Sequence, residues 1–274
     1  MMKTLPIQTL LAAGMILACG ASAPGDMDFP WVAFNDHLGN GGINPNVTEY
    51  STAAGETSSG TLLDVAGGQE TGATLTVSAS GVSWEGQQGN PSAGTDAHDI
   101  FDGFVDFDNG SDASIALAGA DHYTYTFSNL DTADVVTYSF AGTAVRGSAT
   151  YTNRWTVVRL EDADGSTPAH SSGDGVVIIS PTEAAIWVGS NHQADQGFVA
   201  AWTDIDPGSD GDFTIVSQQY TGAVPVSVDA GGVADGSKGY GVTGIRLERV
   251  VPEPATLALL ALGSAGLLRR RRRA

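Results

Sequence analysis

Alternating aspartates form the stretch of this chain that is best suited to hold a metal ion. Asp204, Asp206, Asp210 and Asp212 lie in the run Asp-Ile-Asp-Pro-Gly-Ser-Asp-Gly-Asp. Calcium takes six to eight oxygen ligands, and carboxylates on a glycine-bent loop can converge on it. The run departs from the EF-hand pattern because Ile215 stands where that loop needs an acidic ligand. Since Asp and Gly also build ordinary turns, a calcium site and a plain turn are both open.

Tryptophan is the residue type here that could stack on a sugar ring. Trp84 lies in a glycine-flanked, polar stretch and is the candidate for glycan stacking. Core packing is the alternative, and it is the expectation for three others, Trp155, Trp187 and Trp202.

The histidines and possible nucleophiles indicate a metal or catalytic site less clearly than the aspartates do. His98 lies in Thr-Asp-Ala-His-Asp, without a second histidine at the spacing of a metal site. Four more are scattered and expected to be solvated: His37, His122, His170 and His192. The chain has no Gly-x-Ser-x-Gly turn, and its one cysteine is Cys19. We therefore assign no catalytic residue and no certain cofactor, and predict that the protein is not an enzyme, although a site assembled across loops stays open.

Short strands must position these residues, because the interior lacks a sustained helical stripe and is rich in turn residues. Tyr123, Tyr125 and Phe127 alternate with threonines, and Val136, Tyr138 and Phe140 continue the pattern after a turn, which predicts an antiparallel hairpin. The apolar run 176–179 predicts a strand covered on both faces. Further strands are expected at 46–50 and 104–107. About eleven strands predict an all-β fold, an antiparallel β-sandwich or jelly roll spanning residues 24–250.

The N-terminus has the features of a secretory signal peptide over residues 1–23. Lys3 supplies positive charge, an apolar core runs from Leu10 to Ala18, and Ala21-Ser22-Ala23 is a small-residue cleavage site. Cleavage after Ala21 and lipidation of Cys19 are alternatives.

The interior is strongly acidic once the chain ends are set aside. Removing Lys3, Glu253 and the five C-terminal arginines from 12 basic and 31 acidic residues leaves 6 and 30, a net charge of −24. The electrostatic field of so negative a domain disfavours nucleic acid and anionic polymers as partners, and tolerates divalent cations and neutral glycans.

The C-terminus, residues 251–274, has three parts in a fixed order. The motif Pro252, Glu253 and Pro254 is followed by an uncharged run from Ala255 to Leu268, and then by five arginines: Arg269, Arg270, Arg271, Arg272 and Arg273. The apolar run would make a transmembrane helix of roughly 21 Å, with the arginines held in the cytoplasm.

This order resembles the PEP-CTERM sorting signal of bacterial surface proteins, over less than a tenth of the chain. The resemblance implies that an exosortase, a membrane-embedded cysteine enzyme, recognises the motif and removes the tail. It also implies export to the cell envelope and an association with exopolysaccharide or biofilm. A plain membrane anchor is the alternative.

Together these features predict an exported, surface- or matrix-associated, non-catalytic β-sandwich, with a structural, adhesive or glycan-binding role. The alternatives are an exported polysaccharide-active hydrolase or lyase on a jelly-roll scaffold, and a calcium-dependent adhesin.

Overall fold

The computed structural model describes residues 29–37, 39, 42–51, 57–85, 89–107, 114–146, 152–189, 197–228 and 231–251. The side chains of 83–85, 114 and 115 are not among those described. The predicted signal peptide, residues 1–23, and the motif and tail from Pro252 to Ala274 lie outside the described residues.

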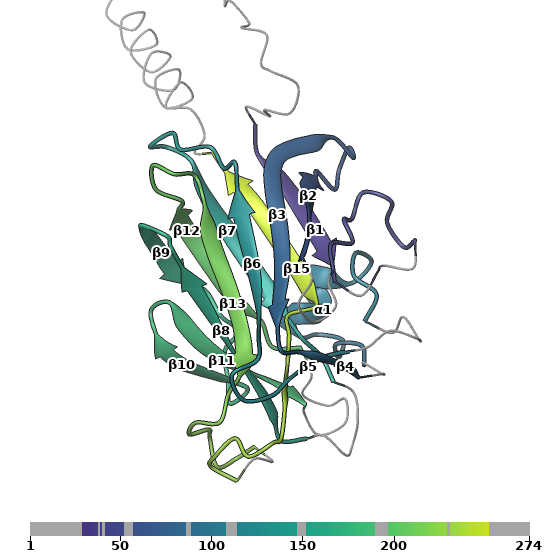
Figure 1. Cartoon of the computed structure of the whole chain (residues 1–274), viewed down its shortest axis with the longest axis vertical. Coiled ribbons are helices and arrows are strands. Elements are labelled where there is room, and N and C mark those ends of the chain that lie inside the picture. Colours follow the sequence, from purple (N-terminus) through teal and green to yellow (C-terminus); the bar gives the residue numbers. More distant parts are fainter. Residues whose placement is uncertain are drawn as a thin grey trace, which may run out of the picture.

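The described chain forms three antiparallel sheets and one short helix (Figure 1). A five-stranded sheet has the order β1 (Trp31–Asp36), β15 (Gly244–Val250), β7 (Thr137–Thr143), β12 (Ala200–Asp206), β9 (Gly165–Pro168). A seven-stranded sheet has the order β10 (Val176–Ser180), β11 (Glu183–Gly189), β8 (Arg154–Glu161), β13 (Phe213–Gln219), β6 (His122–Ser128), β3 (Glu70–Ser80), β2 (Thr57–Leu63). The third sheet joins β14 (Gly239–Tyr240), β5 (Ser114–Leu117) and β4 (Ser83–Glu85), and the helix is α1 (Asp96–Phe101). The predicted all-β, antiparallel class is therefore confirmed.

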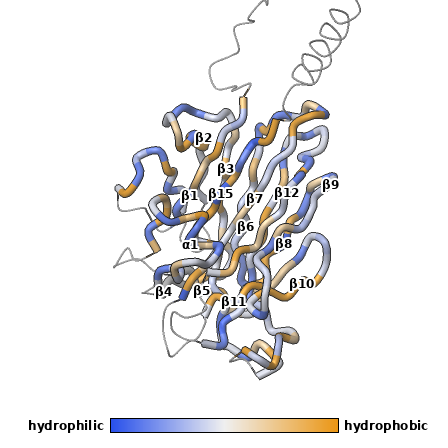
Figure 2. Tube along the Cα trace, turned by 180° about the vertical axis from the view of Figure 1, so that it is seen from behind, coloured by the Kyte–Doolittle hydropathy of each residue, from blue (hydrophilic) through white to orange (hydrophobic). Residues whose placement is uncertain are grey.

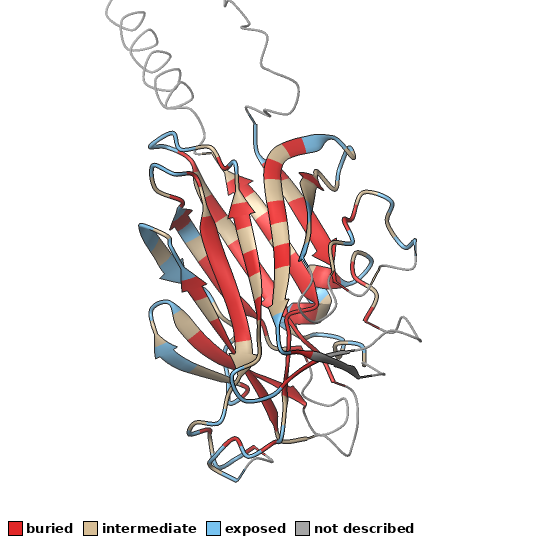
Figure 3. Ribbon diagram, viewed as in Figure 1, coloured by how far each residue is buried: buried red, intermediate tan, exposed pale blue. Residues whose placement is uncertain are grey.

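The main core lies between the five- and seven-stranded sheets. Buried and half-buried residues alternate along β3 and β6 (Figure 3), and hydrophobic residues are interspersed with hydrophilic ones along the strands (Figure 2). Phe127 of β6 and Phe140 of β7 meet across the two sheets, with ring centroids 6.0 Å apart. Each aromatic side chain buried in this way contributes roughly 1.5–3 kcal/mol by leaving water.

The predicted hairpin between 123–127 and 136–140 is wrong, although the faces assigned to its residues are right. Tyr123, Tyr125, Tyr138 and Phe140 are buried as expected. However, β6 pairs with β3 and β13, whereas β7 pairs with β12 and β15. Alternation specifies which face of a strand is apolar and says nothing of its partner. The loop between them therefore crosses from one sheet to the other.

Three local expectations are also corrected. The run 176–179 was expected to be covered on both faces, but β10 is an edge strand in which Ile178 is 66 % exposed. Residues 104–107 form no strand and follow α1 as turns. Residues 46–50 contribute only an isolated bridge from Thr48 to Asn35. Short apolar runs do not distinguish strands from the turns that pack against a sheet.

Both ends of the described domain lie together. Trp31 at the start of β1 pairs with Arg249, and Val250 at the end of β15 pairs with Thr137 at the start of β7. We call this end of the sheets, the upper end in Figure 1, the exit end. The opposite end, where β1 finishes at Asp36 beside Gly244, is called the far end.

Helix α1 covers the outer face of the five-stranded sheet. Its Ala97 and Phe101, with Phe107 from the following turns, join a second core with Phe34 and Ala141 of the sheet. Phe101 and Phe107 approach Gly244 so closely that a Cβ there would lie 3.3 Å and 2.9 Å from their rings. The sheet therefore accepts α1 at the far end because residue 244 has no side chain.

Candidate functional site

Arg249 holds the last strand in place where the C-terminal tail leaves the domain. Its side chain is 6 % exposed and pairs with the carboxylate of Asp131. Its Nη1 also donates to the carbonyl oxygen of Phe29, at 3.2 Å. The backbone N–H of Asp131 donates to Tyr138 Oη at 2.7 Å. The beginning and end of the domain and the loop after β6 are thus joined by one guanidinium.

The same contacts shift the pKa values of two neighbours. Burial alone would raise the pKa of Asp131, but hydrogen bonds from the Ala133 N–H and from Arg249, with the Arg249 charge, hold it below its usual value. Burial raises the pKa of the Tyr138 hydroxyl, and this effect outweighs the opposing hydrogen bonds and the Arg249 charge. At neutral pH the exit end therefore holds an ionised Asp131 against Arg249.

An acidic cavity of about 320 Å³ lies at the exit end. Asp134, Asp164 and Asp206 line it, together with turn residues from 132–137 and 207–209. Asp206 Oδ1 accepts a hydrogen bond from the Gly208 N–H at 2.9 Å, which is a turn contact. Of the four aspartates predicted as calcium ligands, only Asp206 lines this cavity.

The four predicted calcium ligands are not gathered into one ligand set. Asp204 accepts a hydrogen bond from the Thr203 hydroxyl at 3.2 Å. Asp210 lies in a turn, and Asp212 directly precedes β13. In the described parts of the chain, no group of three or more His, Cys, Asp and Glu side chains could hold a metal ion. Asp206 and Asp210 take part in turns here, as Asp commonly does, and calcium binding by this stretch stays a prediction.

A larger cavity, about 440 Å³, lies beside α1, and we call it the α1 cavity. Its polar lining is Asn90, His98, Asp102 and Asp106, and its apolar lining includes Pro91, Val105 and Phe107. Thr95 begins α1 by accepting a hydrogen bond from the His98 N–H at 3.4 Å. Gly103, which also lines the cavity, has φ +78° and no atom within 4 Å of an added Cβ. The helix and the glycine turn after it thus leave the cavity open.

His98 lines this cavity, and it is the histidine that the sequence places in the run Thr-Asp-Ala-His-Asp. Its Nδ1 lies 3.5 Å from Asp99 and its Nε2 lies 3.9 Å from Asp102. Both carboxylate side chains are 73 % exposed, so these are weak pairs. Of the turn residues 102–107 that complete the cavity, 104–107 were expected to form a strand, and Asp102 was not singled out from the sequence.

The other histidines are only partly as expected. His37 is buried, with its ring 4.9 Å from that of Tyr123, so the expectation of a solvated side chain is wrong there. His170 accepts a hydrogen bond from the Ala201 N–H through Nδ1 at 3.0 Å, and burial lowers its pKa. His122 is half-buried at the start of β6, and His192 lies outside the described residues.

Three of the four tryptophans considered from the sequence lie in the core, as expected. Trp155, Trp187 and Trp202 are buried, which confirms them as core residues. Trp84 lies in β4, where its backbone pairs with Ile115 of β5. Its side chain lies outside the described part of the chain, so glycan stacking there stays a prediction.

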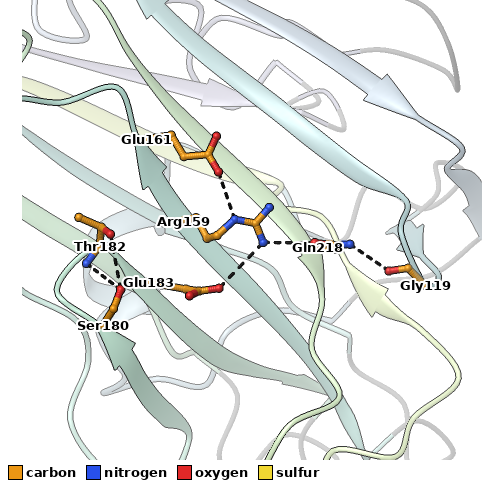
Figure 4. Close-up of polar contacts among 7 residues, drawn as sticks. All are labelled: Gly119, Arg159, Glu161, Ser180, Thr182, Glu183 and Gln218. Carbon is orange, nitrogen blue, oxygen red and sulfur yellow. Dashed lines mark hydrogen bonds and ion pairs between the residues drawn. The ribbon is translucent and has the colours of Figure 1, made fainter.

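Arg159 forms ion pairs with two glutamates on the outer face of the seven-stranded sheet (Figure 4). Its Nε lies 3.2 Å from Glu161, and one Nη lies 4.0 Å from Glu183. It also donates to the side-chain oxygen of Gln218, whose amide donates to the Gly119 carbonyl. Arg159 therefore pairs with carboxylates and offers no basic patch.

The comparisons with known proteins identify the C-terminal segment. A C-terminal sorting signal directly after a folded domain defines an exported protein that is processed at the membrane. The model for the PEP-CTERM protein-sorting motif matches residues 250–273, a range that includes Pro252, Glu253, Pro254 and the five arginines. The chain thus carries this motif, as predicted, and the motif implies processing by an exosortase and membrane anchoring of the tail before processing. No curated protein and no solved structure matches the chain.

The run Ala255 to Leu268, predicted from the sequence to span the membrane, lies outside the described residues. Within the described ranges, no helix has the length and apolar character needed to cross a membrane.

Proposed function

We propose that this protein is an exported, non-catalytic β-sandwich that a PEP-CTERM signal delivers to the cell envelope or matrix. There it serves a structural or adhesive role by binding neutral glycans of the exopolysaccharide. The observation that carries the proposal is the direct continuity of β15 with the sorting motif. Val250 is still paired in the sheet and the motif follows without a linker.

This continuity orients the domain. Val251 packs against the main core, and Pro252 is the next residue. Each extended residue adds at most about 3.3–3.6 Å, so the exit end lies close to the bilayer while the tail is embedded. The far end and the α1 cavity then face away from the membrane.

The charge of the domain restricts its partners. A net charge of −24 over residues 24–250 repels uronic-acid polymers and nucleic acid at low salt. Neutral glycans carry no such penalty, which favours them as matrix partners.

The sorting step is tested by the mass and location of the protein in a host with and without exosortase. We expect a shortened, tail-free form only in the competent host. Glu253→Ala in the motif should leave the full-length chain in the membrane fraction, whereas Glu248→Ala on β15, outside the matched segment, should be processed normally. A full-length wild-type chain in the competent host would refute sorting by this route.

One observation favours a second candidate, a polysaccharide-active hydrolase. The α1 cavity places the imidazole of His98 near the carboxylate of Asp102 and also contains Asp106, and glycosidases act through pairs of carboxyl groups. Release of reducing sugar from neutral polysaccharides, lost in Asp106→Asn, would support this candidate over the non-catalytic one.

A further inference from the structure

The α1 cavity has the size and lining of a small-molecule site. Its volume of about 440 Å³ lies within the roughly 300–1,000 Å³ usual for ligand pockets. Such pockets combine apolar walls with a few polar groups that set orientation. Here Pro91, Val105 and Phe107 supply apolar surface, and four other lining residues supply the polar groups.

The polar lining matches the hydroxyl groups of a sugar. The carboxylate oxygens of Asp102 and Asp106 can accept hydrogen bonds, the Asn90 amide can donate and accept, and the imidazole of His98 can do either. Hydroxyl donors to a carboxylate give short, strong hydrogen bonds. The C–H face of a pyranose ring would pack on the apolar wall. Two carboxylates disfavour an anionic ligand at the same place.

The cavity belongs to the far end of the domain. The backbone N–H of Asp106 donates to the Asp36 carboxylate at 2.7 Å, where β1 finishes. Phe107, beside it, packs over Gly244 at the start of β15. Both residues lie at the opposite end of these strands from Trp31 and Arg249. A glycan can therefore reach the cavity while the tail holds the exit end at the membrane.

We propose that the α1 cavity binds a neutral sugar residue of a glycan, oriented by Asp102, Asp106, Asn90 and His98 against the wall of Pro91, Val105 and Phe107. This inference rests on the proposed glycan-binding function and assigns its site and ligand class.

The test uses the exported protein and calorimetric titration with short oligosaccharides of glucose, galactose and N-acetylglucosamine. Oligogalacturonate and ethylenediamine serve as the anionic and cationic probes. We expect saturable binding of at least one neutral probe, with weaker or no binding of the charged ones. Asp102→Ala should weaken that binding about tenfold, the loss of one hydrogen bond to a charged group. Ala93→Trp, which places a bulky side chain at the cavity wall, should abolish it.

Asp99→Ala is the matched control, since Asp99 is equally exposed, also contacts His98 and does not line the cavity. It should bind like the wild type. Neutral-sugar binding that survives both Asp102→Ala and Ala93→Trp would overturn this site and leave the proposed function standing. Binding of none of the neutral probes, or equal binding of ethylenediamine, would overturn the inference itself. Release of cleaved product would support the site and overturn the non-catalytic function.

Discussion

Arg249→Met tests whether the guanidinium at the exit end stabilises the fold. The substitution keeps much of the apolar stem but removes the contacts to Asp131 and to the Phe29 carbonyl. It leaves the Asp131 carboxylate partly buried, with the Ala133 N–H as a hydrogen-bond donor. Breaking a fully buried pair costs about 3–5 kcal/mol. Because the Asp131 side chain is 31 % exposed, we expect a smaller loss, about 2 kcal/mol.

The assay is thermal and urea unfolding of the processed protein. A loss of about 2 kcal/mol lowers the Tm of a domain of this size by roughly 4–8 °C. Arg246→Met is the matched control, since Arg246 lies on the same strand and pairs with Glu248 at 2.7 Å, but its side chain is 27 % exposed. It should cost about 0.5 kcal/mol or less.

The pH dependence gives an independent check. Arg249 lowers the pKa of Asp131 in the folded state, so the stabilisation is present above the unfolded pKa of about 3.9. It is lost as pH falls through the lower, folded pKa. The stability difference between wild type and Arg249→Met should therefore shrink below about pH 4. Equal costs for Arg249→Met and Arg246→Met, or a difference unchanged down to strongly acidic pH, would refute the reasoning.

Two further predictions concern the core and the acidic turns. Phe140→Ala, at the contact of the two large sheets, should cost about 3–5 kcal/mol in urea unfolding, against almost nothing for Ile178→Ala on the exposed edge. Similar costs for both would contradict the assigned core. Millimolar calcium and magnesium should raise the Tm equally, by screening, because the described aspartates form no ligand set. A larger rise with calcium, lost in Asp206→Asn, would instead show a specific site.

The sequence predicts well which face of a strand is buried, and predicts poorly which strand it pairs with. Tyr123, Tyr125, Tyr138 and Phe140 are buried because period-2 alternation follows from the geometry of any strand. Strand pairing depends on contacts between residues that are far apart in the sequence, and for this reason β6 was assigned to the wrong neighbouring strand. The α1 cavity was out of reach for the same reason. His98 was visible as a candidate, but Asn90 and Asp106 join it only through the folding of 89–107 over the sheet.

The C-terminal segment was predictable because its signal is linear. Pro252 to Arg273 is recognised by order and composition, so no tertiary structure is needed to identify it. The domain that it carries has no comparable linear signature. Its ligand depends on how a short helix and its flanking turns meet a sheet.

The pairing of β15 on both sides has a mechanical consequence. It is bonded to β1 along one edge and to β7 along the other, over almost its whole length. A pull between a glycan at the far end and the embedded tail would run parallel to this strand. The load would then be shared by both ladders of hydrogen bonds in shear, instead of opening them one at a time. A domain whose last strand is paired on both sides in this way resists unfolding when it is pulled through its C-terminal end.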